Sequence, residues 1–465
     1  MTDTAQTTHE VEIDNSNRST TPQTQSFSDY ISSGWAEQPA TLPEALPVAP
    51  FAAARRERLA AQFVGERLVI AAGAMKQRSN DTFYQYRAHS AFAHLTGWGS
   101  ESEPGAILVL DPAQDPAADG ASHTATLYFR ERAGRDSDEF FANPEIGEFW
   151  IGPRPSLGQV SAALGIATAH LADFVPGDTD RTLEDADLAR AASELRLVKD
   201  TFELAEMQAA VDATATGFTE VLAALPAASA HPRGERIVEG VFNQRARLDG
   251  NTVGYETIAA SGPHACTLHW IRNDGPVRSG DLLLLDAGIE LDSLYTADIT
   301  RTVPVSGTFS EVQRRVYDAV LEAADAARAI VRPGIRFSDV HAAAMQVIER
   351  HTRDWGFLPE DDGTAYYRRY MVHGTSHHLG LDVHDCAQAR REMYMEGILE
   401  PGMVFTIEPG LYFQPDDLTV PTEFRGIGVR IEDDIVVTED GCVNLSAGIP
   451  RTADDVEAWI RDAQA

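Results

Sequence analysis

One order of predicted elements occurs twice over residues 200–450, and this repeat constrains the fold more than any other feature of the chain. In each half, apolar residues at helical spacing predict two helices, and apolar or alternating runs after them predict two strand segments. The helices are predicted at about 200–225, 233–248, 310–331 and 338–352, and the strand segments at 252–270, 281–305, 403–414 and 427–438. Residue identity between the halves is weak, so the repeat concerns element order only. The pattern predicts a pseudo-twofold domain in which helices pack on a curved antiparallel sheet.

The length of 465 residues indicates at least two domains, because single cores rarely grow beyond about 300 residues. The first forty residues are rich in Thr, Ser, Gln and Asn, which is typical of a disordered tail. Asp200 and Glu203 form a capping-box pattern that predicts the start of a helix. We therefore expect an α/β two-domain protein with a disordered tail (1–40), an N-terminal α/β domain (41–180), a linker helix (181–199) and the repeat domain (200–465).

The charge of the chain excludes some partners. Asp and Glu number 71 against 38 Lys and Arg, which gives a formal charge of -33. Such a surface repels the phosphates of nucleic acids and of anionic membranes, so we expect neither as a partner. The three cysteines are far apart, and no apolar stretch of about 18 residues is present. These features predict a soluble protein of the cytoplasm.

Two carboxylates stand out in the segment LLLLDAGIELDSLYTADITRT. Asp286 ends a run of four leucines, and Asp298 shares one face of the next strand with Thr300. A carboxylate after such an apolar run is costly to bury unless it is paired or bound to a metal. Metal binding and a purely structural role, with Asp286 capping a turn and Asp298 hydrogen-bonded, fit this segment about equally well.

Histidines and two further carboxylates follow in the second half. The segment HGTSHHLGLDVHD holds four histidines within residues 373–385, a density that indicates metal binding or proton transfer. A packing role remains plausible for any one of them, most of all for His378. The strands GMVFTIEPGLYF and GIGVRIEDDIVV present Glu408 and Glu432, although a surface pair between Arg430 and Glu432 would also fit the second strand.

Five of these side chains form a candidate metal site: Asp286, Asp298, His377, Glu408 and Glu432. Four carboxylates facing one cavity would repel each other unless cations neutralised them, and two divalent ions would balance the charge. Oxygen donors with one nitrogen suit Mn²⁺, Co²⁺ or Zn²⁺. Two ions about 3.5–4 Å apart can bind a bridging hydroxide and polarise a carbonyl group, which is the chemistry of hydrolysis.

The order DAG…ADITRT, HGTSHHLGLDVHD, TIEPG and RIEDD resembles the creatinase/methionine aminopeptidase superfamily, peptidase family M24B, with its pita-bread fold. Within it the chain is most similar to bacterial aminopeptidase P, and the upstream segment SNDTFYQYRAHSAFAHLTGW resembles the N-terminal domain of that family. The resemblance implies that Asp286 binds one metal, that His377 and Glu408 bind the other, and that Asp298 and Glu432 bridge them. It also implies that three histidines hold the substrate and stabilise the tetrahedral intermediate, with two residues behind the ligands. These positions are His269, His373 and His384, and then Arg430 and Tyr412.

The resemblance implies an enzyme that removes the N-terminal residue from peptides with proline at the second position. A metal-bridging hydroxide would attack the scissile carbonyl while Glu408 moves the proton. The two ions are expected to be Mn²⁺, with Co²⁺ or Zn²⁺ possible, and the chain is expected to form a dimer or tetramer. Asp286 and Asp298 are twelve positions apart, one more than is usual in the family. A bulge or a longer turn would absorb the extra residue; otherwise Asp298 would face the wrong side.

Three alternatives stay open at the level of sequence. A prolidase, which cleaves Xaa-Pro dipeptides only, would share all five ligands. A metal-free amidinohydrolase of the creatinase type would not need the ligands. A non-enzymatic binding module of the same fold should have lost them, and here all five are present.

Overall fold

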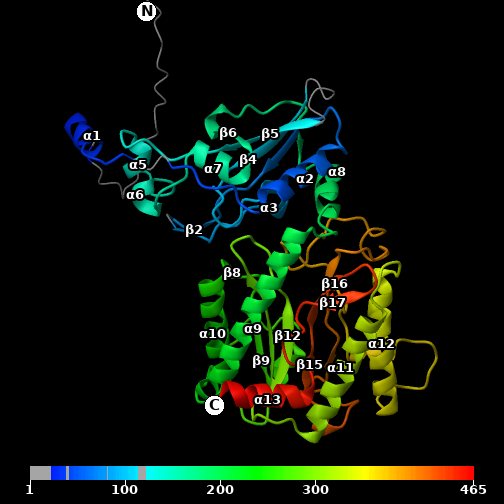
Figure 1. Cartoon of the computed structure of the whole chain (residues 1–465). Helices are drawn as coiled ribbons and strands as arrows, with labels where there is room; N and C mark the ends of the chain where they lie inside the picture. Colours follow the sequence, from blue (N-terminus) through cyan, green and yellow to red (C-terminus); the bar gives the residue numbers. More distant parts are fainter. Residues whose placement is uncertain (1–21, 23, 38–40, 81, 114–121) are drawn as a thin grey trace, which may run out of the picture. The chain divides into compact units, whose positions relative to one another are not determined.

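The computed structural model describes residues 22, 24–37, 41–80, 82–113 and 122–465, and the chain divides into two compact units between Asp185 and Ala186. Both units combine helices with β-sheets, which confirms the predicted α/β class (Figure 1). Within these described ranges no helix is both long and apolar enough to span a bilayer.

The N-terminal unit is built around a five-stranded mixed sheet in the order β6-β5-β4-β1-β7. Its strands are β1 (Leu68–Ala71), β4 (Ile107–Pro112), β5 (His123–Phe129), β6 (Ala167–His170) and β7 (Arg181–Thr182), and β2 (Gln77–Ser79) pairs with β3 (Thr82–Phe83) in a separate hairpin. The helices are α1 (Gln25–Ile31), α2 (Ala49–Ala60), α3 (Ser90–Thr96), α5 (Asp138–Ala142), α6 (Glu148–Ile151), α7 (Leu157–Leu164) and the 3₁₀ helix η1 (Leu171–Asp173). The central strands β1 and β4 are antiparallel and mostly buried, so the core of this unit lies around them.

The segment predicted as a disordered tail contains one helix. Residues 1–21, 23 and 38–40 lie outside the described residues, but α1 spans Gln25–Ile31. The Thr24 hydroxyl accepts a hydrogen bond from the Phe27 amide (3.4 Å), and the Phe27 ring packs edge-on against Phe141 (5.8 Å between centroids). The prediction is wrong for this helix because it rested on the polar composition of the whole segment. Composition does not show that a single aromatic side chain, Phe27, packs against another ring.

The predicted linker helix 181–199 is also shorter in the structure. Arg181 and Thr182 form β7, which pairs in parallel with β1, and helix α8 spans Ala186–Glu194. The Thr182 amide donates a hydrogen bond to Asp185 Oδ2 (2.8 Å), and this turn separates the strand from the helix. Asp200 then caps the next helix with the predicted capping box, in which Asp200 accepts from the Glu203 amide.

The first half of the C-terminal unit contains two long helices and short antiparallel sheets. Its elements are α9 (Thr201–Ser229), α10 (Gly234–Asp249), β8 (Thr252–Val253), β9 (Ile258–Ser261), the 3₁₀ helix η2 (Gly262–Cys266), β10 (Leu282–Ala287), β11 (Ile289–Glu290) and β12 (Ile299–Pro304). The main sheet has the order β12-β10-β9. The strand predicted over 252–270 is wrong beyond residue 261, because Gly262 takes a left-handed conformation (φ 56°) and Pro263 follows.

The second half repeats this order. Its elements are α11 (Glu311–Ile330), α12 (Phe337–Asp354), η3 (Tyr366–Arg369), β13 (Val404–Ile407), β14 (Gly410–Tyr412), η4 (Thr422–Phe424), β15 (Gly428–Arg430), β16 (Asp433–Val437), β17 (Cys442–Asn444) and the final helix α13 (Ala453–Ala463). In Figure 1, α9 and α10 flank one side of the strands and α11 and α12 the other. The buried faces of both helix pairs and of the strands form one apolar core, as the repeat predicted.

Candidate metal centre

The strand pair β10–β12 holds two carboxylates on one face. Asp286 pairs with Thr300 across these strands, and paired residues point to the same side of a sheet. Asp298 precedes Thr300 by two positions and shares this face. Between the strands, residues 291–295 form a turn closed by hydrogen bonds from Leu294 N to Leu291 O (2.8 Å) and from Leu291 N to Tyr295 O (2.9 Å). The hairpin therefore accommodates its length without turning Asp298 away from Asp286.

The second half of the unit presents three more donors to the same place. Glu408 follows β13, Glu432 lies between β15 and β16, and His377 lies on a segment beside β13. The Thr406 amide donates to His377 O (2.9 Å), which aligns the histidine with the strand. The Thr300 hydroxyl donates to Glu432 Oε2 (2.7 Å), so the first half orients a carboxylate of the second.

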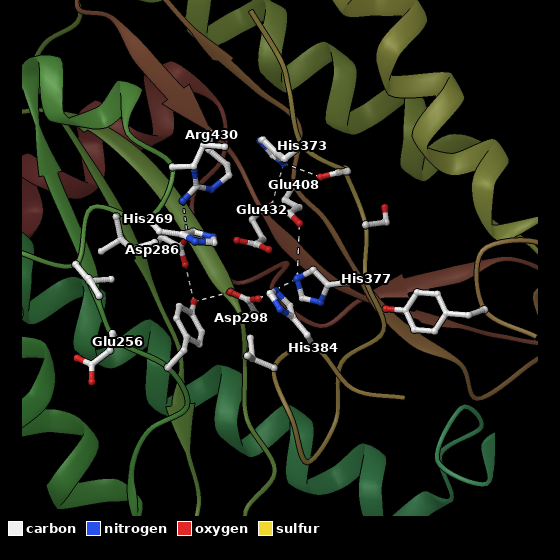
Figure 2. Close-up of a pocket in the computed structure, with 18 residues that line it drawn as sticks. Glu256, His269, Asp286, Asp298, His373, His377, His384, Glu408, Arg430 and Glu432 are labelled. Carbon is white, nitrogen blue, oxygen red and sulfur yellow. Dashed lines mark hydrogen bonds and ion pairs between the residues drawn. The ribbon is translucent and has the colours of Figure 1, made fainter. Parts of the chain in front are cut away.

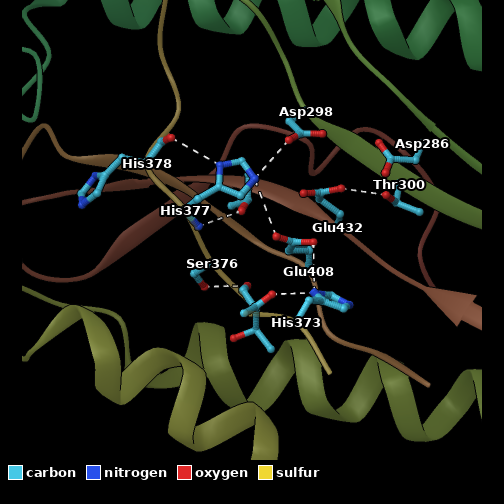
Figure 3. Close-up of polar contacts among 12 residues, drawn as sticks. Asp286, Asp298, Thr300, His373, Ser376, His377, His378, Glu408 and Glu432 are labelled. Carbon is cyan, nitrogen blue, oxygen red and sulfur yellow. Dashed lines mark hydrogen bonds and ion pairs between the residues drawn. The ribbon is translucent and has the colours of Figure 1, made fainter. Parts of the chain in front are cut away.

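The donor atoms of these residues lie close together. His377 Nε2 lies 3.2 Å from Asp298 Oδ2 and 3.6 Å from Glu408 Oε1. Asp298, His377 and Glu432 each offer an atom within 4.8 Å of the other two, a spacing that one metal ion can span. Figure 3 shows these side chains converging, with Glu408 beside Glu432.

Two further side chains hold the carboxylates in place. The Tyr255 hydroxyl lies 2.6 Å from Asp286 Oδ1 and 2.5 Å from Asp298 Oδ1, so it can donate its hydrogen bond to either. Arg430 forms an ion pair with Asp286 and donates to the Tyr412 hydroxyl (3.0 Å). Arg430 is 4% exposed and therefore places a buried cation, and not a surface pair, behind the carboxylates.

The electrostatics of the cluster show a shortage of positive charge. Burial raises the pKa of Glu432 well above its usual value, and the nearby carboxylates raise it further. Burial likewise raises the pKa of Glu408 to about 7, although His377 and Arg430 oppose this. Burial alone would lower the pKa of His377, but its hydrogen bond to Asp298 and the charge of Glu408 raise it to about 9. These shifts follow from the burial of several carboxylates beside one another, a cost that divalent cations bound among them would offset.

This cluster fits divalent cations. Its donors are four carboxylates and one imidazole, a set that suits Mn²⁺, Co²⁺ or Zn²⁺. The side chains come from four separate segments and are buried or half-buried, and like charges at such distances persist only with counter-charge. The arrangement can therefore hold metal.

The three other predicted histidines lie around the same cavity. His373 Nε2 lies 2.8 Å from the Tyr412 hydroxyl, and His373 Nδ1 lies 3.6 Å from Glu408 Oε2. Burial lowers the pKa of His373 to about 3, so its ring is neutral near pH 7. The His384 ring meets the His377 ring edge-on (4.3 Å between centroids), and burial lowers the pKa of His384 as well.

The segment that carries His269 is held by a buried carboxylate. Glu235, on α10, accepts hydrogen bonds from the Ser261 amide (2.9 Å), the Gly275 amide (2.6 Å) and Trp270 Nε1 (2.9 Å). His264 Nδ1 also lies 2.7 Å from Glu235, and its ring stacks on Trp270. Glu235 therefore anchors both ends of the loop in which His269 is placed.

All of the predicted site residues except Tyr412 line one cavity of about 530 Å³ (Figure 2). Tyr412 lies behind it, in contact with His373 and Arg430. The cavity wall also includes residues that the sequence did not single out. These are Tyr255, Glu256, Ile258, Leu268, Ile271, Gly374, Ser376, Val383 and Tyr394. Gly374, Ser376 and Val383 lie within the segment HGTSHHLGLDVHD, but no motif marks the others, because their place depends on how distant segments pack.

Comparisons with known proteins agree with this geometry. A model of metallopeptidase family M24 matches residues 205–439, and a model of the aminopeptidase P N-terminal domain matches residues 52–188. The chain is 48% identical over 461 residues to Xaa-Pro aminopeptidase 1 of Streptomyces coelicolor, covering 93% of this chain and 91% of that protein. It is 50% identical over 460 residues to Xaa-Pro aminopeptidase 2 of the same organism, covering 93% and 96%.

A solved structure shares the fold. Zn-substituted E. coli aminopeptidase P in complex with product superposes with a TM-score of 0.74 at 30% identity, covering 90% of this chain and 100% of that one. The match includes both the N-terminal domain and the pita-bread domain. The chain therefore belongs to metallopeptidase family M24 and, within that family, to bacterial aminopeptidase P.

Proposed function

We propose that this chain is a metal-dependent Xaa-Pro aminopeptidase, which hydrolyses the bond between the N-terminal residue of a peptide and a following proline. The observation that carries the proposal is the convergence of four carboxylates and His377 from both halves of the repeat on one cavity. The similarity to two Xaa-Pro aminopeptidases over 93% of the chain supports the same activity.

Five residues are proposed as ligands of two divalent ions. Asp286 would bind one ion, His377 and Glu408 the other, and Asp298 and Glu432 both. When bound, such a pair of ions lowers the pKa of a water molecule and polarises the carbonyl oxygen of the scissile bond. Mn²⁺ is proposed as the physiological ion, and Co²⁺ or Zn²⁺ would suit the same donors.

Glu408 is proposed to move the proton. It lies beside His377 (3.6 Å) and His373 (3.6 Å), at the surface of the cavity. A carboxylate in this place can accept a proton from the attacking water and deliver it to the leaving nitrogen. The nitrogen of any scissile peptide bond must gain a proton before it can leave as an amine, and the proline nitrogen is no exception.

The histidines are proposed to hold the substrate. His269 and His384 project imidazoles into the cavity, while Tyr412 and Arg430 fix the orientation of His373. Hydrogen bonds from these rings can stabilise negative charge on the carbonyl oxygen as it develops. The apolar walls accept the proline ring and exclude water, which strengthens these interactions.

Hydrolysis of three peptides tests the proposal. With Mn²⁺ supplied, Ala-Pro-Ala should release alanine, whereas Ala-Ala-Ala should be cleaved poorly and exhaustive chelation should abolish turnover. Cleavage of Ala-Pro with an inert Ala-Pro-Ala would indicate a prolidase instead. Turnover of creatine that survives chelation would indicate the metal-free amidinohydrolase, and no hydrolysis of any peptide with metal would indicate a binding module.

We also propose the number of metal ions that each chain binds and the oligomeric state of the protein. Mass spectrometry of the native protein should find two metal ions for each chain. Sedimentation should find a dimer or tetramer, which the family resemblance predicts. The cytoplasmic location remains a prediction from composition.

A further inference from the structure

Glu256 is an acidic side chain on the wall of the cavity that the metal centre does not use. It lines the cavity next to Tyr255 in the chain, yet it is exposed, whereas Asp286 and Asp298 are buried. Among the described residues Glu256 has no hydrogen-bond or ion-pair partner. Figure 2 shows it at the edge of the cavity, well apart from His373 and Glu408. A free carboxylate therefore faces the cavity from its outer edge.

The cavity has two ends, and they orient a peptide. Glu408 and His373 occupy one end, where the proposed proton donor requires the leaving proline nitrogen. The N-terminal residue lies on the other side of the scissile bond and so extends toward the end formed by Asp286 and Tyr255. Glu256 lines the cavity on this side, beyond Asp286 in Figure 2, so a long first side chain that extends outward would meet it.

The main-chain nitrogen of the substrate cannot reach this edge. Two bonds separate it from the scissile carbonyl carbon, so it stays within about 2.5 Å of that atom. It therefore remains among the buried carboxylates of the metal centre. A group at the exposed edge is reached only by a long side chain.

The wall of the cavity also suits such a side chain. Ile258, Leu268 and Ile271 line it with apolar surface that the aliphatic stem of lysine or arginine can cover. Long basic side chains commonly pack their stems on apolar surface and place the charged end near water. A carboxylate at the exposed edge completes this pattern with opposite charge.

We propose that Glu256 is a specificity-determining residue that favours peptides whose first residue is lysine or arginine. This inference rests on the proposed aminopeptidase function and adds the class of first residue. An exposed ion pair of this kind favours its ligand by about two- to fivefold in kcat/KM at low salt. Added salt weakens it, because ions screen exposed charges.

The test compares Arg-Pro-Ala with citrulline-Pro-Ala, since citrulline keeps the shape of arginine but has no charge. The wild-type enzyme with Mn²⁺ should cleave the arginine peptide about two- to fivefold more efficiently in kcat/KM. Glu256→Gln should bring the ratio of the two values to about one, and Glu256→Lys should reverse it. The control Glu439→Gln removes the same charge from an exposed side chain that does not line the cavity, and it should keep the wild-type ratio.

Each outcome decides a different claim. Equal kcat/KM values for both peptides in the wild type, or a preference that survives in Glu256→Gln, would overturn the role of Glu256 and leave the aminopeptidase function intact. If Glu439→Gln lost the preference as well, overall charge and not Glu256 would be responsible. No cleavage of either peptide with metal present would instead overturn the proposed function.

Discussion

The metal centre draws its residues from two differently supported regions, the strands and the histidine segment 373–385. Asp286 lies within a ladder of strand pairs, and Asp298 and Glu432 lie at strand ends. The histidine segment has no helix or strand of its own. The strands place their carboxylates along a ladder of backbone hydrogen bonds. The histidine segment has only a few backbone bonds to β13, such as Thr406 N to His377 O (2.9 Å), and depends as well on side chains that pack behind it. The comparison teaches that side chains of one site can rest on different kinds of support.

Buried charges provide the support behind the histidine segment. Asp385, which follows His384, accepts a hydrogen bond from Arg196 Nε (2.8 Å) and lies 3.8 Å from Lys199 Nζ. All three of these side chains are buried. Gly380 approaches the same cluster so closely that an added Cβ would lie 2.4 Å from Asp385 Oδ2. The segment is therefore fixed by a charge cluster that tolerates little change.

The largest effect, on metal content and turnover, is expected from Glu432→Ala at the strands. The substitution removes a proposed ligand of both ions, so the protein should bind less than two metal ions and lose turnover while remaining folded. Metal content by mass spectrometry, hydrolysis of Ala-Pro-Ala and circular dichroism measure the three properties. The exposed control Glu439→Ala should bind metal as the wild type does. An unchanged content of two ions in Glu432→Ala would contradict its role as a ligand.

The next largest effect is expected behind the histidine segment, from Asp385→Asn. Loss of the Asp385 charge leaves the buried Arg196 cation with only the more distant carboxylate of Asp382 (3.7 Å), which should cost up to about 3–5 kcal/mol of unfolding free energy. Burial alone would raise the pKa of Asp385, but the charges of Arg196 and Lys199 lower it below its usual value. The pair therefore stabilises the fold fully above the unfolded pKa of about 3.9, and this contribution is lost as pH falls through the lower folded pKa.

Urea unfolding at pH 7 and at acidic pH checks this prediction. The difference between Asp385→Asn and the wild type should shrink as the pH falls below about 4. The exposed pair of Arg190 with Asp187 (3.3 Å) provides a control. Asp187→Asn should change stability by less than about 1 kcal/mol. Equal losses in the two variants would show that burial of the Asp385 cluster is unimportant.

A smaller effect, on metal affinity, is expected from Tyr255→Phe, which alters a contact to the aspartates of the strands. The hydroxyl bonds to Asp286 and Asp298, and loss of such a contact behind a metal ligand typically weakens metal binding about 10–100-fold. Competition with a chelator measures the affinity. The control Tyr366→Phe removes a hydroxyl that bonds to Asp362 at the surface, and it should leave metal affinity unchanged. Equal affinities for Tyr255→Phe and the wild type would mean that strand pairing alone orients the two aspartates.

The sequence predicted the ligands better than their supports, for a physical reason. Asp286, Glu408 and Glu432 each accompany an apolar strand, and a carboxylate in such a place is anomalous enough to be noticed. Tyr255 and Glu235 have no such signal, because a tyrosine before a strand and a glutamate in a helix are ordinary. Their roles depend on contacts across 31 and 40 positions of the chain, from Tyr255 to Asp286 and from Glu235 to Gly275. The local sequence pattern shows which buried carboxylates cost free energy. Only the packing of distant segments shows which contacts offset that cost.

The smallest effect, on stability, is expected from His378→Phe in the histidine segment. His378 is 1% exposed, stacks on Phe337 (4.7 Å between centroids) and points away from the carboxylates in Figure 3. Among the described residues its Nδ1 has no hydrogen-bond partner. Burial, together with the charge of Lys199, lowers its pKa to about 3. The packing role that the sequence left open for this histidine therefore agrees with its surroundings.

Relative to the wild type, the substitution should stabilise the protein increasingly as the pH falls. At pH 7 a phenylalanine keeps the stacked ring and removes the unsatisfied Nδ1, but it also loses the hydrogen bond of the ring to the Val404 backbone, so stability should change by less than about 1 kcal/mol. In the wild type, the unfolded chain binds a proton at His378 below about pH 6.5, and the folded chain does so only near pH 3. Wild-type stability therefore falls through this window, so the advantage of His378→Phe should grow by up to about 2 kcal/mol between pH 7 and pH 5. Parallel stability curves for the two proteins over that range would show that His378 takes up its proton without unfolding, and that the histidine segment yields more readily than the strands beside it.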